Sequence, residues 1–102
     1  MTPNLKQTAG SLWTFLTNHS HVLISIAQNP EARMRDIADR VGITERAVQR
    51  IVEDLTESGY LRVEKVGRRN RYAVLAKRYL RHPVEEHVQI GKLLEMVLGE
   101  RE

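Results

Sequence analysis

The stretch that decides the fold of this 102-residue chain is RMRDIADRVGITERAVQRIVEDLTESGYLRVEKVGRRNRYAV, residues 33–74. Its first half holds two amphipathic patterns separated by Gly42-Ile43-Thr44. Glycine tolerates the left-handed conformation that ends a helix, and a threonine hydroxyl can cap the next helix. We therefore expect a helix over residues 35–41, a tight turn, and a second helix over residues 44–58.

The second of these helices has one apolar and one polar face. Apolar residues recur at intervals of three and four: Val48, Ile51, Val52 and Leu55. The opposite face of the first two turns carries Thr44, Glu45, Arg46, Gln49 and Arg50, with Ala47 at its margin. Arginine can form two hydrogen bonds to guanine and glutamine two to adenine, so this face suits the major groove of DNA. The alternative is a solvated face on which Arg50 pairs with Glu53 or Asp54.

A basic hairpin is expected next. Gly59 closes the helix, and residues 60–66 and 72–75 have the composition and alternation of two strands around a loop at residues 67–71. The residues of this hairpin expected to contact DNA are Lys65, Arg68, Arg69, Asn70 and Arg71. Cations crowded in this way repel one another, and an anionic partner would relieve that repulsion. Such a loop can follow phosphates or enter a narrow minor groove. The alternative is an exposed turn.

The positive charge of the chain is concentrated. Between Tyr60 and His82 there are eight basic residues and one acidic residue, although the net charge of the whole chain is only +3. A localised basic patch is what phosphate binding requires. The alternative is a basic surface that only contributes to solubility.

Composition excludes several classes of protein. The length suits one domain, no apolar run approaches the roughly 20 residues of a membrane span, and the N-terminus lacks a secretory pattern. A soluble, cytoplasmic protein is expected. There is no cysteine, no Ser, His and Asp grouping and no glycine-rich phosphate loop, so we expect neither an enzyme nor a cofactor. His19 with His21, and His82 with His87, lack the i, i+4 spacing of a helical metal pair, so no metal site is expected.

The N-terminal region is less informative. Residues 1–10 are polar and expected to be flexible. Trp13 and Phe15 are expected to be packing anchors. Asn18 or Ser20 can cap a first helix, which Asn29-Pro30 should end because proline disfavours helix in the residue before it.

The C-terminal region suggests a dimer. Pro83 can occupy the first turn of a helix, with His82 as its cap, and the apolar residues that follow cover more than half of the helix circumference. Together with Trp13 and Phe15, the expected dimer interface comprises Val84, Val88, Ile90, Leu93, Leu94, Val97 and Leu98. A monomer would leave this surface in water, which large apolar patches rarely are. The alternative is a helix docked wholly on its own core.

Three segments carry a family resemblance: IADRVGIT at residues 37–44, AVQRIVEDL at residues 47–55 and ESGYL at residues 57–61. They resemble the winged helix-turn-helix of MarR-type bacterial and archaeal transcriptional regulators, and the ArsR type is similar too. The resemblance implies a recognition helix at residues 44–58, a wing at residues 63–74 and a homodimer on a pseudo-palindromic operator. The chain is short beside the MarR pattern, so the resemblance gives no support to a small-molecule effector pocket.

The expected fold is mainly α with a small β-hairpin, an α+β class. Its parts are a flexible N-terminus (1–10), a winged helix-turn-helix domain (11–78) and a C-terminal dimerisation helix (79–102). The expected function is sequence-specific binding of double-stranded DNA by a homodimeric transcriptional regulator, in the first instance a repressor. Two alternatives stay open: a winged-helix module that binds protein, and an architectural protein that binds nucleic acid without sequence preference.

Overall fold

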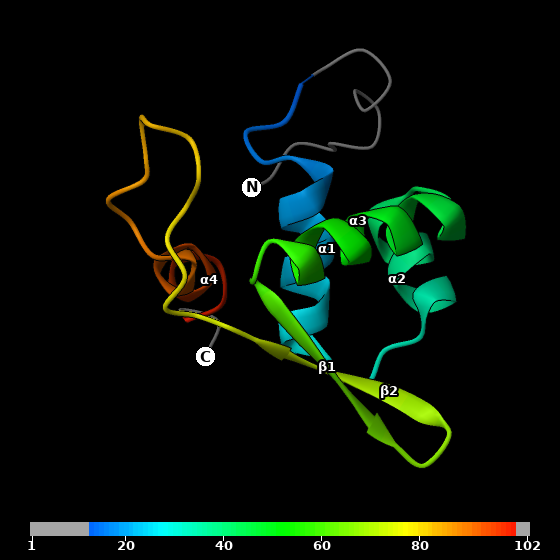
Figure 1. Ribbon diagram of the computed structural model, residues 1–102. Coiled ribbons are helices and arrows are strands. Elements are labelled where there is room, and N and C mark those ends of the chain that lie inside the picture. Colours follow the sequence, from blue (N-terminus) through cyan, green and yellow to red (C-terminus); the bar gives the residue numbers. More distant parts are fainter. Residues whose placement is uncertain (1–12, 100–102) are drawn as a thin grey trace.

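The computed structural model describes residues 13–99 and has the predicted α+β winged-helix fold (Figure 1). In chain order its elements are α1 (Asn18–Gln28), α2 (Met34–Val41), α3 (Glu45–Glu57), β1 (Leu61–Val66), β2 (Arg69–Val74) and α4 (Ile90–Leu98). None of the helices within the described residues is both long enough and apolar enough to cross a bilayer. The expectation of a flexible segment at residues 1–10 lies outside the described residues.

Helix α1 begins and ends at polar side chains. Thr17 caps it, because its Oγ1 accepts a hydrogen bond of 3.2 Å from the Ser20 backbone N–H. The prediction of Asn18 or Ser20 as the cap was wrong by one and three residues, respectively. Several neighbouring side chains can accept the hydrogen bond of an N-cap, so the sequence did not distinguish them. Asn29 ends the helix, as predicted.

The turn between α2 and α3 has the predicted chemistry. Gly42 is left-handed, with φ +88°, and its N–H donates to the Ala38 carbonyl over 2.8 Å. Thr44 then caps α3 by accepting a 3.0 Å bond from the Ala47 N–H. The two helices therefore meet within three residues of chain, and the direction of α3 is fixed at its first turn.

One apolar core joins all the elements. Its buried members are Val22, Leu23, Ile26, Ile37, Ala38, Val48, Ile51, Val52, Leu55, Tyr60, Leu61, Tyr72, Ile90 and Leu94. The four apolar residues predicted for α3 are all among them. Burial of side chains of this size stabilises a fold by roughly 1.5–3 kcal/mol each, so the core holds α3 firmly and leaves its other face free.

The hairpin is longer and its turn tighter than predicted. The antiparallel register pairs Leu61 with Val74 and continues to Val66 opposite Arg69, so only Gly67 and Arg68 lie between the strands. A glycine with φ +65° at the first of two loop positions is the pattern of a type II′ hairpin turn. The prediction of a loop over residues 67–71 was therefore wrong. Residues 69–71 belong to β2, where exposed strand positions accommodate their polar and basic side chains.

The C-terminal helix begins at Ile90 and not after Pro83, so the predicted helix start was wrong. Residues 80–89 form a loop that an antiparallel bridge between Tyr79 and Gln89 closes. Two long-range backbone bonds hold it, from Leu80 N to Val88 O (2.9 Å) and from Ile90 N to Arg78 O (2.7 Å). His82 caps a turn of this loop by accepting at Nδ1 from the Val84 N–H, where a helix cap was expected.

Two expectations about apolar residues also need correction. Ile90 and Leu94 are buried in the core of their own chain, so they are not free for a partner, whereas Leu93 and Leu98 are half-buried against that core. Conversely, Trp13 and Phe15 are not anchors of the core. Their side chains are 72% and 90% exposed and contact each other edge to face, with ring centroids 4.8 Å apart.

Candidate nucleic-acid interface

The polar face of α3 is presented to solvent as the sequence predicted. Thr44, Glu45, Arg46, Gln49 and Arg50 are exposed, and Ala47 is half-buried at the edge of the face. Neither Arg46 nor Arg50 forms an ion pair with another residue in the described part of the chain, and the expected alternative pairing of Arg50 with Glu53 or Asp54 is not present there. Two cationic side chains on a rigid helix are thus free to contact a ligand.

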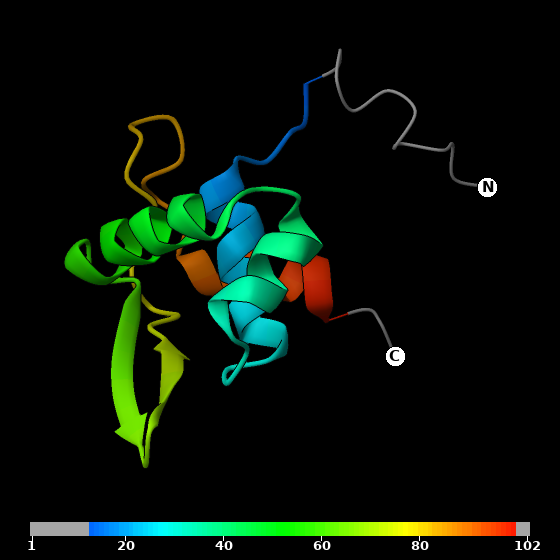
Figure 2. The same ribbon diagram turned by 90° about the vertical axis from the view of Figure 1, so that its right-hand side faces the viewer.

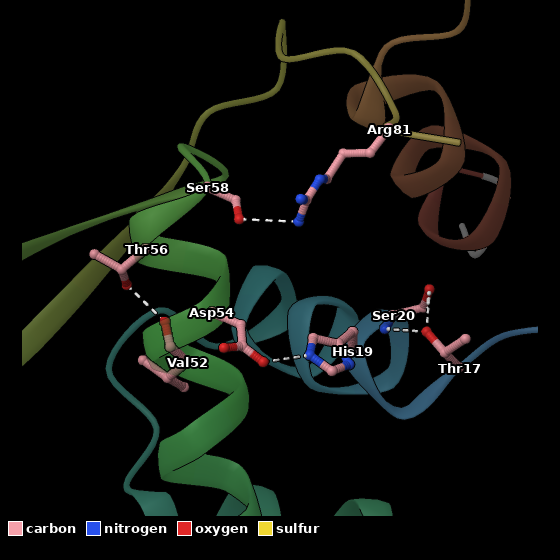
Figure 3. Close-up of polar contacts among 8 residues, drawn as sticks. All are labelled: Thr17, His19, Ser20, Val52, Asp54, Thr56, Ser58 and Arg81. Atoms are coloured by element: carbon pink, nitrogen blue, oxygen red, sulfur yellow. Dashed lines mark hydrogen bonds and ion pairs between the residues drawn. The ribbon is translucent and has the colours of Figure 1, made fainter. Parts of the chain in front are cut away.

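The charge of α3 reverses along its length. After Arg50 the exposed charged residues are Glu53, Asp54 and Glu57. Asp54 Oδ2 lies 2.9 Å from Nε2 of His19 on α1, a contact that ties α3 to α1 (Figure 3). Because carboxylates repel phosphates, the surface suited to DNA is confined to the first half of α3. We call the six residues of this face the reading head: Thr44, Glu45, Arg46, Ala47, Gln49 and Arg50.

The start of α1 lies beside the reading head. A shallow groove of about 880 Å³ is lined by Asn18 and His19 of α1 and by Thr44, Arg46, Ala47, Gln49 and Arg50. The sequence contained no signal for this proximity, because α1 and α3 are brought together by packing. The beginning of α1 is therefore part of the same surface.

The inner face of the wing adjoins the reading head. Alternation along the strands places Lys65 and its cross-strand partner Asn70 on the same face as Val63 and Tyr72. That face lines a groove of about 340 Å³ together with α3, in which Asn70 of the wing and Gln49 of the reading head both take part. The structure thus brings predicted residues of the helix and of the wing into one depression.

The outer face of the wing is partly engaged by the protein itself. The Arg69 Nη2 donates to the Glu31 backbone carbonyl over 3.3 Å, and Arg71 Nε lies 4.0 Å from the Glu31 carboxylate. The Tyr72 N–H also donates to the Pro30 carbonyl over 3.0 Å, so β2 is held against the link between α1 and α2. No sequence pattern indicated Glu31, which lies 38 residues from Arg69. Arg68, at the turn, has no such contact within the described residues.

The reading head and the wing project from the same side of the molecule. Figure 1 shows the beginning of α3 and the hairpin tip on the right, with α4 and the 80–89 loop on the left. When this right-hand side is turned to the viewer, α3 crosses above the hairpin, whose tip extends downward (Figure 2). Such an arrangement lets a helix enter one groove of a duplex while a loop reaches the adjoining backbone.

The rest of the basic block lies elsewhere. Arg81 Nη1 donates to Ser58 Oγ over 3.1 Å, at the C-terminal end of α3 (Figure 3). The Arg78 guanidinium lies over Gly59, where an added Cβ would meet its Cζ at 3.1 Å. Cations at this end of a helix offset the negative end of its dipole. The single basic patch read from the sequence is therefore two, and only the wing faces the reading-head side.

The described histidines have partners within the chain or lie apart. In residues 13–99, no three side chains of His, Cys, Asp or Glu are grouped as they would be around a metal ion. His19 contacts Asp54, and His21 Nδ1 lies 3.2 Å from the Asn18 side-chain oxygen.

Comparison with known proteins agrees with the fold. Residues 16–62, which run from the start of α1 into β1, match a family model described as winged helix-turn-helix DNA-binding. A second similarity, 29% identity over 68 residues, is to an uncharacterized protein of Methanocaldococcus jannaschii. The match covers 66% of this chain but 14% of that protein, so the chain spans a small part of the length of this relative. The chain thus has a winged-helix fold, and residues 16–62 are similar to a family described as DNA-binding.

Proposed function

We propose that this protein is a sequence-specific regulator of transcription that binds double-stranded DNA as a homodimer. In each subunit the reading head enters the major groove, and the wing contacts the flanking backbone or minor groove. The segments at residues 37–61 support a regulator of the MarR type, and repression is the activity that we propose. The protein acts by occupying DNA and not by catalysis.

The observation that carries this proposal is the free, rigid first half of α3. Arg46 and Gln49 project from a helix whose other face is buried and whose first turn is capped by Thr44. A side chain on such a support loses little further freedom on binding, so its hydrogen bonds to base edges can discriminate. Each good two-bond contact to a base contributes roughly 1–3 kcal/mol of discrimination.

The wing supplies the second part of the proposed contact. Asn70 lines the groove beside α3, Lys65 is its cross-strand partner on the same face of the hairpin, and Arg68 lies at the hairpin turn. Phosphate contacts of this kind orient a protein on the duplex and carry no sequence information. Arg69 and Arg71 contact phosphates only when their contacts with Glu31 are broken.

A homodimer explains how so small a reading surface could be specific. One subunit reads a few base pairs, and two subunits related by a twofold axis read two half-sites spaced by roughly 34 Å, one helical turn. The operator is then expected to be pseudo-palindromic.

Selection from a pool of randomised duplexes, followed by titration of the selected and a scrambled duplex at two salt concentrations, tests the proposal. A regulator should enrich one pseudo-palindromic sequence and bind it on the order of 10³-fold or more above the scrambled duplex. Equal binding of both duplexes, with a steep salt dependence, would indicate the architectural alternative instead. No binding to either would favour a protein-binding module.

A further inference from the structure

An open groove lies on the side of the molecule away from the hairpin. It has a volume of about 650 Å³ and runs between α1, the end of α3 and the 80–89 loop. Leu23, Leu55 and Ile90 form its floor, and Leu80 and Pro83 of the loop form one wall. Pockets of roughly 300–1,000 Å³ hold drug-sized molecules, so the groove is large enough for aromatic side chains.

The rim of the groove is polar and carries charges of both signs. Arg81 lies on it together with the carboxylates of Asp54, Glu57 and Glu85. Figure 3 shows two contacts at this rim, from His19 of α1 to Asp54 of α3 and from Arg81 to Ser58 at the end of α3. A guanidinium such as that of Arg81 is attracted to the face of an aromatic ring. An aromatic occupant therefore suits the apolar floor and the Arg81 side of the rim.

The same chain exposes a pair of aromatic side chains that are not part of the groove lining. Trp13 and Phe15 are 72% and 90% exposed, and the groove lining begins only at His19. The bond from Thr14 Oγ1 to the Leu16 carbonyl and the Thr17 cap fix how the chain enters α1. In the view of Figure 2, residues 13–17 and the 80–89 loop lie apart, on either side of the start of α1. The pair thus does not cover the groove of its own subunit.

We propose that Trp13 and Phe15 of one protomer occupy the groove of a second copy, and that the exchange is reciprocal. This deepens the homodimer of the proposed function and rests on it. The partner is a second copy because the chain carries both halves of the contact, a protruding aromatic pair and a groove with an apolar floor and the Arg81 guanidinium at its rim. A surface of this kind is self-complementary, as a twofold dimer requires.

The buried area is adequate for such a dimer. A buried Trp or Phe covers 150–250 Å² of its own surface, so four rings with the groove surface beneath them correspond to roughly 1,200–2,000 Å², the size of a stable interface. Burial in the centre of an interface also makes aromatic residues the commonest energetic hot spots. Phe15 should therefore contribute strongly although it contributes little to the fold of its own chain.

The test uses Trp13 as its own probe, because it is the single tryptophan of the chain. Sedimentation and Trp13 emission are followed over a concentration series for the wild type, for Phe15→Ala and for Leu80→Ser in the groove wall. Met96→Ala is the matched control, since Met96 is 65% exposed on α4, outside the groove lining. We expect the wild type to dimerise with a blue shift of Trp13 emission, and both test variants to raise the dimer dissociation constant by roughly tenfold or more. Met96→Ala should match the wild type.

Several outcomes would overturn the inference. A wild type that is monomeric throughout, a Phe15→Ala dimer as tight as the wild type, or a dimer disrupted only by Met96→Ala would each do so. A blue-shifted Trp13 in the monomer, shifted to the red by Leu80→Ser without a change of mass, would show occupancy of its own groove and contradict the exchange. Dimerisation as expected without binding of any duplex would leave this interface standing and refute the proposed regulator.

Discussion

The two halves of the basic block differ in what they contact. On the wing, which lies on the side of the reading head (Figure 1), Lys65 and Arg68 have no ion-pair partner in the described residues. Beyond the hairpin, Arg78 and Arg81 lie against Gly59 and Ser58 at the C-terminal end of α3. Basic residues of the same block thus lack an ion-pair partner in one place and contact the protein itself in the other. A count of basic residues overstates the free cationic surface, because some cations are engaged at this end of α3 and others by Glu31 on the wing.

The largest effect is expected at the reading head. Arg46→Ala should cost about 1–3 kcal/mol at the selected operator and flatten the preference over a scrambled duplex, because a contact to a base edge is lost. Gel-shift titration of both duplexes measures this. Arg40→Ala, an exposed arginine at the end of α2, is the control and should leave the preference unchanged. If Arg46→Ala keeps full preference, the reading head is misplaced.

Next in size is the wing turn. Arg68→Ala should weaken binding to every duplex alike and reduce the slope of log affinity against log salt by about one unit, since one phosphate contact disappears. Arg69→Ala should have the same sign but a smaller effect, because Arg69 already donates to the Glu31 carbonyl. Titrations at several salt concentrations compare the two. A larger effect of Arg69 would mean that its bond to Glu31 is given up on DNA.

A smaller change is expected at Glu31. Glu31→Gln removes the carboxylate 4.0 Å from Arg71 and should raise affinity for all duplexes. Exposed ion pairs contribute roughly 0.2–1 kcal/mol, so the gain in affinity should be on the order of 1.4- to fivefold. Glu86→Gln, in the 80–89 loop, is the matched control. Weaker binding of Glu31→Gln would instead show that Glu31 orients the wing for DNA.

The smallest effect on DNA is expected beyond the hairpin. Arg78→Ala should leave affinity and salt slope as in the wild type, although it removes the same charge as Arg68→Ala. It should lower the free energy of unfolding by about 0.3–1 kcal/mol, the usual contribution of a cation at a helix C-terminus, as measured by urea denaturation. A fall in the salt slope equal to that of Arg68→Ala would erase the distinction between the two halves.

Local signals made much of the fold predictable. The turn at Gly42, the cap at Thr44 and the apolar face of α3 depend on residues within a few positions of one another, and all three are confirmed. The α+β class and the polar surface of α3 followed from these. Which of those polar residues contact DNA stays a prediction.

The errors lie where distant residues decide. Pro83 could have begun a helix, but backbone bonds from Leu80 to Val88 and from Ile90 to Arg78 close a loop instead. Arg69 and Arg71 were expected in the loop at the hairpin tip, whereas cross-strand pairing extends β2 through both. The contacts of Glu31, His19 and Arg81 join residues 38, 35 and 23 positions apart, and no spacing rule reaches that far.

The sequence by itself determined the helices, the glycine turns and the charge of the hairpin, because caps, periodicity and left-handed glycines act within one or two turns of chain. Only the tertiary structure decided which cations are free, where the last helix begins and which apolar side chains are left in water. Those outcomes depend on packing and on hydrogen bonds between distant backbone groups. A segment with a given local pattern is compatible with either outcome, and the contacts of the whole folded chain select one of them.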